Sequence, residues 1–376
     1  MVKFIHTADW QIGMKAAHVG SAGETVRAER LVSAQRVVNA AKENQADFMI
    51  VAGDTFEDNS VDRVLVQKVA DILAGFPKPV FIISGNHDPL VPGSVWEHPA
   101  WSSHPNLRVV REAKPIELEN LTLYPSPLFE KHSLVNPVGW IDATGNPKIS
   151  VGIAHGTISG VSQGVIDYPI ERDAATVAGL DFLALGHHHS FATYPAADGS
   201  VRLAYSGAHE TTKFGERDSG NVVLVEIHAR GSIPVLTPIR TGGLMWTTLD
   251  ETVTEAGDMS RIREKLEALG EIENSLVELK LAGVLHQAAQ GEFTRIQELL
   301  QARFLYGRYD SSNLLPSPTD ETWLSELPVG LMQSVAQQLH HWTDPAYVGE
   351  RPSIASTDVA TRSLLELYRL MQEQTS

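Results

Sequence analysis

The sequence predicts an α/β fold in which a parallel or mixed sheet is covered by helices. Short apolar runs of four to six residues, rich in Val, Ile and Phe, alternate with segments whose apolar residues recur every three to four positions. Each apolar run stops at a polar cluster. Strand–helix–strand alternation sets strands side by side with helices outside. In such sheets ligands gather beyond the carboxyl ends of the strands, where these polar clusters would lie.

Five of the apolar runs are predicted strands. They are Val2–Thr7, Phe48–Ala52, Val80–Ser84, Ile149–Ala154 and Phe182–Leu185. Two amphipathic helices are expected between the first three strands, over Arg27–Glu43 and Val61–Leu73, because their apolar residues follow a period of 3.6. We expect the five strands to deliver their polar clusters to one sheet edge.

The remainder of the chain predicts further elements and two boundaries. Strands of a second sheet are expected at Val201–Ser206, Asn221–Ile227 and Ile233–Ile239. A small α/β unit follows, with a helix at Met259–Leu269 capped by Asp258, a half-exposed strand at Ser275–Ala282 and a helix at Glu292–Phe304. A linker is predicted at Asn313–Asp320, before amphipathic helices at Pro328–His341 and Asp358–Gln374. We therefore expect three parts: 1–240, 241–312 and 313–376.

Composition narrows the possible chemistry. The 376 residues include no cysteine, which excludes disulfides, thiolate metal sites and a cysteine nucleophile. A metal ion would be held by imidazole, carboxylate, amide or water, ligands that suit manganese, magnesium, iron or zinc. The sequence has no run of about 18 apolar residues and no apolar leader at its start. We expect no membrane span, no signal peptide and a cytoplasmic location.

The formal net charge of −16 bears on whether the chain binds nucleic acid. DNA binding normally draws on basic patches that release counterions from the phosphates. Residues 241–376 alone carry 10 Lys and Arg against 20 Asp and Glu. This balance weakens a nucleic-acid role without excluding it, because bound divalent ions would offset some of the acidic charge. It suggests that most DNA affinity would come from a partner.

The polar clusters at the strand ends combine carboxylate, amide and imidazole side chains. They comprise Asp9 and Gln11, Gly53-Asp54, Gly85-Asn86-His87-Asp88, His155, and Gly186-His187-His188-His189. Each residue alone is more often a turn residue or a satisfied histidine, but convergence of five clusters at rigid strand ends suits a metal centre. If the last segment is extended, His187 and His189 share a side and His188 points elsewhere.

These motifs resemble the five motifs of the metallophosphoesterase superfamily, in the same order. The finer resemblance is to DNA-repair exonucleases of the SbcD type, the bacterial counterparts of the Mre-eleven nuclease. It is carried by His6-Thr7-Ala8-Asp9-Trp10, Gly53-Asp54-Thr55-Phe56-Glu57-Asp58, and Tyr205-Ser206-Gly207-Ala208-His209-Glu210 followed by Phe214-Gly215-Glu216. It covers residues 1–240 well, reaches 241–310 weakly, and extends to the last helices only by position and amphipathicity.

The resemblance implies a four-layer α/β/β/α metallophosphoesterase sandwich with a small α/β capping domain and C-terminal helices. It also implies metal-dependent hydrolysis of DNA phosphodiester bonds by two divalent ions, manganese above all, with magnesium, iron or zinc as alternatives. The implied partners are DNA and an SMC-like ATPase of the SbcC type, which the C-terminal helices would bind. A homodimer is one implied assembly.

Residue roles follow from the same resemblance. One ion would be held by Asp9, Gln11, Asp54 and His189, and the other by Asp54, Asn86, His155 and His187, with Asp54 bridging. His87 would protonate the leaving oxygen or stabilise the transition state. Asp88 would orient His87 or cap a turn, and His209 and Glu210 would contact substrate or serve the structure.

One position departs from the family pattern and leaves alternatives open. The first motif usually reads Asp-x-His, and Gln11 stands at its third position here. Its amide oxygen either coordinates a hard cation more weakly than imidazole or binds only a metal-bound water. Two other functions therefore remain: a phosphodiesterase for a small molecule such as a cyclic nucleotide, which the acidic charge suits, and a binding subunit with a weakened metal site.

Overall fold

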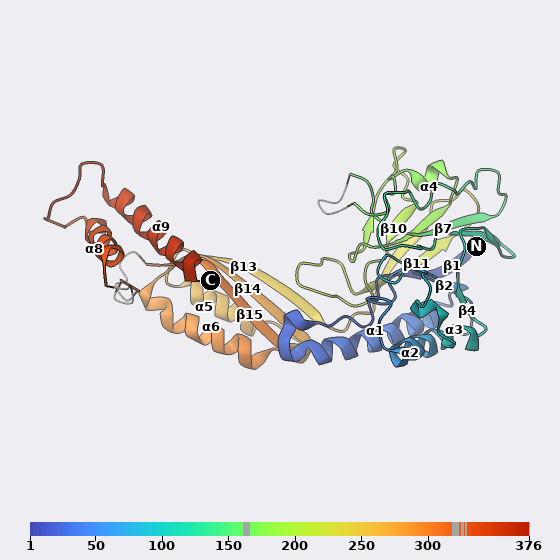
Figure 1. Ribbon diagram of the computed structural model, residues 1–376, viewed down its shortest axis with the longest axis horizontal. Helices are drawn as coiled ribbons and strands as arrows, with labels where there is room; N and C mark the ends of the chain where they lie inside the picture. Colours follow the sequence, from blue (N-terminus) through green and yellow to red (C-terminus); the bar gives the residue numbers. More distant parts are fainter. Residues whose placement is uncertain (161–165, 318–322, 325–326, 328, 376) are drawn as a thin grey trace. The chain divides into compact units, whose positions relative to one another are not determined.

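The computed structural model describes residues 1–160, 166–317, 323–324, 327 and 329–375 (Figure 1). It divides into two compact units, Met1–Leu244 and Met245–Ser376. The mixed α/β class predicted from the sequence is confirmed. Within the described residues no helix is long and apolar enough to cross a membrane.

Two six-stranded sheets form the centre of the first unit. The first sheet has the order β12-β11-β1-β2-β3-β4, built from β1 (Val2–Thr7), β2 (Phe48–Ala52), β3 (Val80–Ile83), β4 (Leu107–Val109), β11 (Asn221–Ile227) and β12 (Val235–Arg240). The second has the order β5-β6-β7-β8-β10-β9, built from β5 (Ile116–Glu117), β6 (Leu121–Pro125), β7 (Ile149–His155), β8 (Phe182–Gly186), β9 (Ala192–Thr193) and β10 (Leu203–Tyr205).

Alternation along the strands builds the layers of the sandwich. In β2, Phe48 and Ile50 enter the core shared by the two sheets, whereas Met49 and Val51 enter the core beneath the helices. This period of two is what a strand buried on both faces requires. The helical layer consists of α1 (Gly23–Glu43) and α2 (Arg63–Ala74), with the short α3 (Ala100–Ser103) beside them. The opposite face of the second sheet is covered by α4 (Ala174–Val177) and irregular chain.

Two of the predicted strand groupings are wrong. The five strands that carry the polar clusters divide between the sheets: β1, β2 and β3 lie in the first, and β7 and β8 in the second. The three later strands also divide, since β10 pairs with β8, while β11 pairs antiparallel with β1 and brings β12 into the first sheet. An apolar run records burial but not the neighbouring strand, so its sheet could not be assigned from sequence.

The second unit begins with a three-stranded parallel sheet. Its strands are β13 (Met245–Val253), β14 (Ser275–Leu285) and β15 (Tyr306–Pro316), with β14 in the centre. Helices α5 (Asp258–Glu267) and α6 (Gln290–Arg303) share a hydrophobic core with the sheet, and Ile262, Leu279 and Ile296 lie within it. Asp258 was predicted as the N-cap, but the helix begins at this residue and its carboxylate accepts hydrogen bonds from the preceding Thr254 and Glu255.

The predicted linker starts too early. Asn313–Pro316 complete β15, where they pair with β14, and residues 318–320 lie outside the described residues. Two helices follow, α8 (Leu331–Thr343) and α9 (Thr357–Thr375), and α9 contacts both α8 and β15. Pro328, the predicted start of the first of these helices, also lies outside the described residues.

Candidate metal centre

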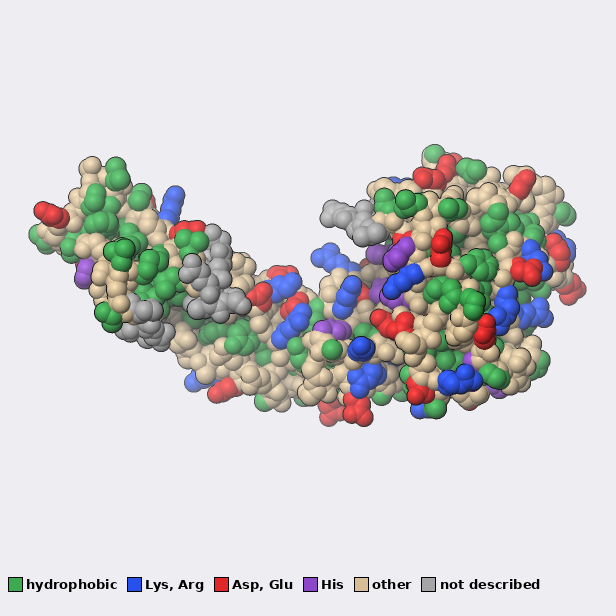
Figure 2. All heavy atoms as spheres, in the orientation of Figure 1, with side chains coloured by type: hydrophobic (Ala, Val, Ile, Leu, Met, Phe, Trp, Pro, Cys, Tyr) green, Lys and Arg blue, Asp and Glu red, His purple; other side chains and the backbone are tan. Residues whose placement is uncertain are grey.

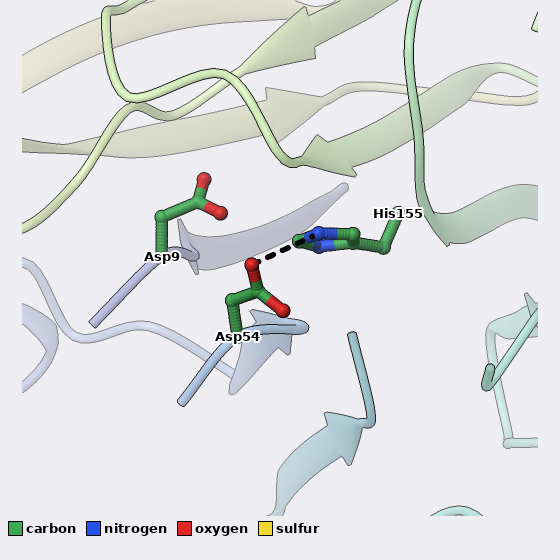
Figure 3. A group of neighbouring side chains, drawn as sticks. All are labelled: Asp9, Asp54 and His155. Atoms are coloured by element: carbon green, nitrogen blue, oxygen red, sulfur yellow. Dashed lines mark ion pairs between the residues drawn. The ribbon is translucent and has the colours of Figure 1, made fainter. Parts of the chain in front are cut away.

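A carboxylate–imidazole cluster lies where the carboxyl ends of the two sheets meet. Asp9 follows β1, Asp54 follows β2, and His155 is the last residue of β7. One ligand atom from each lies within 4.8 Å of the others, and all three side chains are buried (Figure 3). The convergence at strand ends predicted from the sequence is therefore found, but it is formed between two sheets.

Glycines allow this close approach. A Cβ atom at Gly53 or Gly186 would collide with the ring of His155, and one at Gly85 would collide with the carboxylate of Asp54. The backbone at Gly53 also has a φ of 88°, which residues with side chains rarely adopt. Glycine at these positions is thus required by the packing of the cluster itself.

Several of the predicted ligand residues also adopt left-handed backbone conformations. The φ angles are 54° at Asp9, 41° at Gln11, 49° at Asp54 and 110° at His187. Such conformations cost free energy in residues other than glycine and concentrate at functional sites. The angle at His187 also shows that this segment is not extended, so the condition under which His187 and His189 would share a side is not met.

Four side-chain atoms of the predicted second ligand set lie close together. The Nε2 atom of His155 is 2.9 Å from Asn86 Oδ1 and 3.3 Å from Asp54 Oδ2. The Nδ1 atom of His187 is 3.2 Å from the same Asn86 oxygen. The Nδ1 atom of His155 is 2.9 Å from the carbonyl oxygen of Ala52, to which its N–H donates, so Nε2 of the neutral ring carries the lone pair. In the neutral ring, nitrogen and oxygen lone pairs would face one another, so either a proton on Nε2 or a metal cation must lie between them.

The electrostatics of the cluster lead to the same conclusion. Burial lowers the pKa of His155, but the adjacent carboxylates of Asp54 and Asp9 outweigh burial and raise it to about 9. Burial raises the pKa of Asp9 to about 6. For Asp54, burial acts in the same direction but His155 outweighs it and lowers the pKa to about 2. Within the described residues, neither carboxylate has a Lys or Arg partner at ion-pair distance. The donor set therefore fits divalent cations.

Asp9, Gln11 and His189, the other predicted ligands, make contacts of their own. The backbone N–H of Gln11 donates to the backbone carbonyl of Asp54 over 2.9 Å, and the residue is almost fully buried. Asp9 accepts the backbone N–H of His187 through its carboxylate oxygens, at 2.9 and 3.1 Å. Burial lowers the pKa of His189, but the bonded carboxylate of Glu216 and the charge of Asp9 raise it overall.

His87 is held against the second motif. Its backbone N–H donates to Asp54 Oδ1 over 2.9 Å, and its ring Nδ1–H donates to the carbonyl oxygen of Glu57, also at 2.9 Å. The residue is half-buried. This placement puts an imidazole beside the cluster without making it a member.

Asp88 serves the turn and does not orient the ring of His87. Its two carboxylate oxygens accept the backbone N–H groups of Gly85 and Phe56, at 2.7 and 2.9 Å. Burial, reinforced by Asp54, raises the pKa of this fully buried carboxyl to about 7. Of the two roles considered from sequence, the contacts correspond to turn capping, which positions Asn86 and His87 for the cluster.

The predicted substrate contacts of His209 and Glu210 are wrong, because both side chains have 0% exposure. His209 stacks on Trp10 with ring centroids 4.8 Å apart, and its Nε2–H donates to the carbonyl oxygen of Arg30. The carboxylate of Glu210 accepts hydrogen bonds from Ser33 Oγ and from the backbone N–H of Gly243, at 2.6 and 2.7 Å. These contacts are structural, because they join the segment of His209 and Glu210 to Trp10, to α1 and to Gly243.

Sequence reasoning missed two residues that hold the site in place. Arg30 is 1% exposed and donates to the carbonyl oxygens of Trp10 and Glu210, so that α1 fixes the loop between Asp9 and Gln11. Glu216 contacts His189 directly. Arg30 lies in no motif with recognisable spacing. For Glu216 the only signal is the family resemblance of the segment that ends at this residue.

Comparison with known proteins agrees with this geometry. The family model described as calcineurin-like phosphoesterase matches residues 2–191, which contain every residue of the cluster. The chain belongs to the calcineurin-like phosphoesterase family. Members of this metallophosphoesterase family bind divalent metal ions and hydrolyse phosphoesters.

Three curated metallophosphoesterases and nucleases are similar to the chain. The uncharacterized metallophosphoesterase YhaO of Bacillus subtilis is 25% identical over 279 residues, or 70% of this chain and 66% of that protein. The nuclease SbcCD of Staphylococcus saprophyticus has one component that is 24% identical over 247 residues, covering 57% and 62%. The DNA double-strand break repair protein Mre11 of Archaeoglobus fulgidus is 33% identical over 91 residues, covering 23% and 19%. The alignments thus span less than two thirds of each relative.

Proposed function

We propose that this calcineurin-like phosphoesterase is a metal-dependent DNA exonuclease that hydrolyses phosphodiester bonds with two divalent ions, manganese above all. The observation that carries the proposal is the buried cluster of Asp9, Asp54 and His155, with Asn86 Oδ1 2.9 Å from His155 and 3.2 Å from His187. We assign Asn86, His155 and His187 to one ion and Asp9, Gln11 and His189 to the other, with Asp54 shared. One carboxylate has two oxygens and can bridge two cations about 3.5–4 Å apart.

The residues around the cluster have separate tasks in this proposal. Bound divalent ions supply Lewis acidity toward the phosphoryl oxygens and an activated water. His87 would act as an imidazolium that gives its Nε2 proton to the leaving oxygen, while its Nδ1–H donates to the carbonyl oxygen of Glu57. Asp88 holds the turn that presents His87. The buried network of Arg30 and Glu210 keeps the Asp9 loop rigid, which preserves the distances that catalysis needs.

DNA as the substrate class is supported by two relatives, one named as part of a nuclease and the other as a DNA-break repair protein. The net charge of −16 argues that the chain does not grip DNA strongly by itself. We therefore propose a cytoplasmic complex in which an SMC-like ATPase of the SbcC type supplies DNA affinity. The C-terminal helices would bind this partner, and a homodimer of the nuclease chain completes the proposed assembly.

The decisive experiment compares three substrates with the purified chain in manganese buffer. End-labelled linear DNA, a chromogenic phosphodiester and cyclic nucleotides are each assayed, with a chelator as the blank. We expect chelator-sensitive cleavage of the chromogenic phosphodiester and release of nucleotides from DNA ends. Far faster hydrolysis of cyclic nucleotides would replace DNA with a small-molecule substrate.

Gln11 provides the test of the third possibility, a binding subunit with a weakened metal site. Gln11→His restores the imidazole of the usual motif at a position that the backbone already fixes. On our proposal the wild-type chain binds two ions and turns over, and Gln11→His tightens only the first ion. A wild-type chain that is inert and binds one ion, with activity gained in Gln11→His, would instead identify a binding subunit.

A further inference from the structure

Glu216 places a buried carboxylate directly behind His189. Its Oε1 atom lies 2.7 Å from Nδ1 of His189, and the side chain of Glu216 is only 6% exposed. The segment that carries Glu216 follows the last metal motif by more than 20 residues, yet its carboxylate is the nearest charged group to this ring nitrogen among the contacts found. The contact therefore needs an explanation in terms of the site.

Thr212 holds the carboxylate of Glu216 in place. Its Oε2 atom accepts the backbone N–H of Thr212 over 2.8 Å, and Oε1 accepts the hydroxyl of Thr212. The same hydroxyl lies 3.3 Å from Nδ1 of His189. A carboxylate with its lone pairs engaged in this way has one orientation, so it can impose an orientation on the ring that it contacts.

The hydrogen bond determines which nitrogen of His189 is free. With Nδ1–H donating to Glu216, a neutral ring carries its lone pair on Nε2, which is directed away from Glu216. His189 lies two residues after His187, whose backbone N–H donates to the carboxylate of Asp9, so His189 is on the segment that borders the cluster. A carboxylate bonded to the outer nitrogen of a metal-binding histidine fixes its tautomer and raises its basicity.

We propose that Glu216 is a positioning residue for the first metal ion, acting through His189, and that Thr212 completes the contact. The inference rests on the proposed metal site and extends it, because it assigns a role to a residue outside the ligand set. Where Gln11 supplies a weaker ligand than imidazole, the basicity of His189 matters more for holding this ion.

The test measures manganese affinity of the intact chain by calorimetry, with no substrate present. Glu216→Gln removes the charge while keeping the size, and we expect affinity at one of the two sites to fall about 10- to 100-fold. Glu216→Ala should lose at least as much. Asp218→Asn is the matched control, since Asp218 is an exposed acid two residues away whose φ of 52° asparagine tolerates.

A double-mutant cycle separates positioning from general support of the fold. If Glu216 acts through His189, then Glu216→Gln should cause no further loss of metal affinity in a His189→Ala background. An additional loss there, or affinity within twofold of the wild type in the single variant, would overturn the inference. A wild-type chain that binds no second ion would instead count against the proposed function. Circular dichroism of the metal-free variants establishes whether they fold. If Glu216→Ala does not fold, the result for Glu216→Gln alone decides the test.

Discussion

The Oδ1 atom of Asn86 lies 2.9 Å from the Nε2 atom of His155. Since Nδ1–H of His155 is directed to a backbone carbonyl, a neutral His155 and the amide oxygen present lone pairs to each other. Either a proton or a metal ion must lie between them and the adjacent Asp54 carboxylate. In the presence of divalent ions the cation replaces the proton, so metal binding and folding should be thermodynamically linked.

Saturating manganese should therefore stabilise the chain. At a concentration 100 times the dissociation constant, one ion bound only by the folded state contributes about 2.7 kcal/mol. Asp54→Asn removes the bridging carboxylate and should abolish most of this stabilisation, together with the binding of both ions. Thermal unfolding with and without manganese, combined with metal analysis, measures both effects.

Asp173→Asn is the control for that experiment, because Asp173 is exposed and its side chain makes no capping bond at α4. It should keep two ions and the full shift in melting temperature. If Asp54→Asn still bound two ions with unchanged affinity, the assignment of Asp54 as the bridge would be wrong.

Turnover should depend on His87 without metal binding depending on it. His87→Gln removes the proton held at Nε2, and general acid catalysis typically contributes a factor of about 10² to 10⁴ in kcat. The variant should retain two ions, since the ring of His87 contacts Glu57 and lies outside the ligand sets. Steady-state kinetics on a chromogenic phosphodiester and metal analysis provide the two readouts.

His132→Gln is a suitable comparison, since His132 is a largely exposed histidine of the same unit that pairs with Asp167. Its kcat should stay within twofold of the wild type. Loss of metal in His87→Gln would move His87 into the ligand set, and full activity would remove it from the mechanism.

Glu210 should matter for stability and not for substrate binding. Glu210→Ala would remove the acceptor of the buried Ser33 hydroxyl and of the half-buried N–H of Gly243. An unsatisfied buried donor costs about 1–3 kcal/mol, so the free energy of unfolding should fall by about 3 kcal/mol. Urea unfolding measures the loss. Weaker DNA binding at unchanged stability would restore the substrate role that the burial of this residue contradicts.

Acid should destabilise the fold partly through His6. Burial, partly offset by a hydrogen bond to the carbonyl of Leu185, lowers the pKa of His6 to about 3. In the unfolded chain the pKa is near 6.5, so below that pH only the unfolded state binds the proton. Stability from this group is complete above about pH 6.5 and falls by about 1.4 kcal/mol for each unit of pH toward 3.

The comparison variant for this effect is His6→Gln, which keeps an N–H for the carbonyl of Leu185 but does not titrate. In urea unfolding with a chelator present, the wild type should lose about 1 kcal/mol more than the variant between pH 6.5 and pH 5.5. Parallel stability curves for the two proteins would show that His6 is protonated in the folded state as well.

How much of this site the sequence could predict follows from which interactions are local. Strands β1, β2 and β11 begin and end at the predicted residues, because strands buried on both faces read as continuous apolar runs. The polar residue after each run marks the end of its strand, so Asp9 and Asp54 could be predicted. The same signal gave the ligand candidates but not the two sheets between which they meet.

The rest depends on contacts between distant segments or on backbone conformations without a residue signature. Nothing in the sequence signals the φ of 110° at His187, because histidine rarely adopts such an angle and no glycine stands there. Glu216 reaches His189 from a loop 27 positions away. The burial of Glu210 follows from its bonds to α1 and to Gly243, which no local pattern announces. Strand β13 was not predicted, because its half-exposed residues do not alternate clearly between apolar and polar types.

The docking of the proposed ATPase partner concerns the C-terminal helices. The apolar stripe expected on the last helix is partly used within the unit: Leu364 is buried with Leu324 and Ala336, and Tyr368 packs against Trp323. What remains open is a groove of about 580 Å³ between α8 and α9, lined by Val335, Leu339, Arg362, Ser363, Glu366, Leu367 and Leu370. Val335 and Leu370 are 41% and 47% exposed, and Figure 2 shows hydrophobic side chains gathered over these helices.

We expect this groove to receive an apolar helix of the SMC-like ATPase, a common mode of recognition between amphipathic helices. The paired substitutions Val335→Glu and Leu370→Glu place charges in the groove and should weaken the complex by more than about tenfold, since burying each apolar side chain contributes about 1.5–3 kcal/mol.

Because α9 also contacts β15, substitution is a cleaner test than truncation. Leu331→Glu is the matched control: Leu331 is 79% exposed on α8 but does not line the groove. Co-purification with the ATPase should be lost in the paired variant and kept in the control, with turnover of the chromogenic phosphodiester unchanged in both. A complex that survives the paired substitutions would refute docking in this groove, and loss in both proteins would place the contact elsewhere on α8.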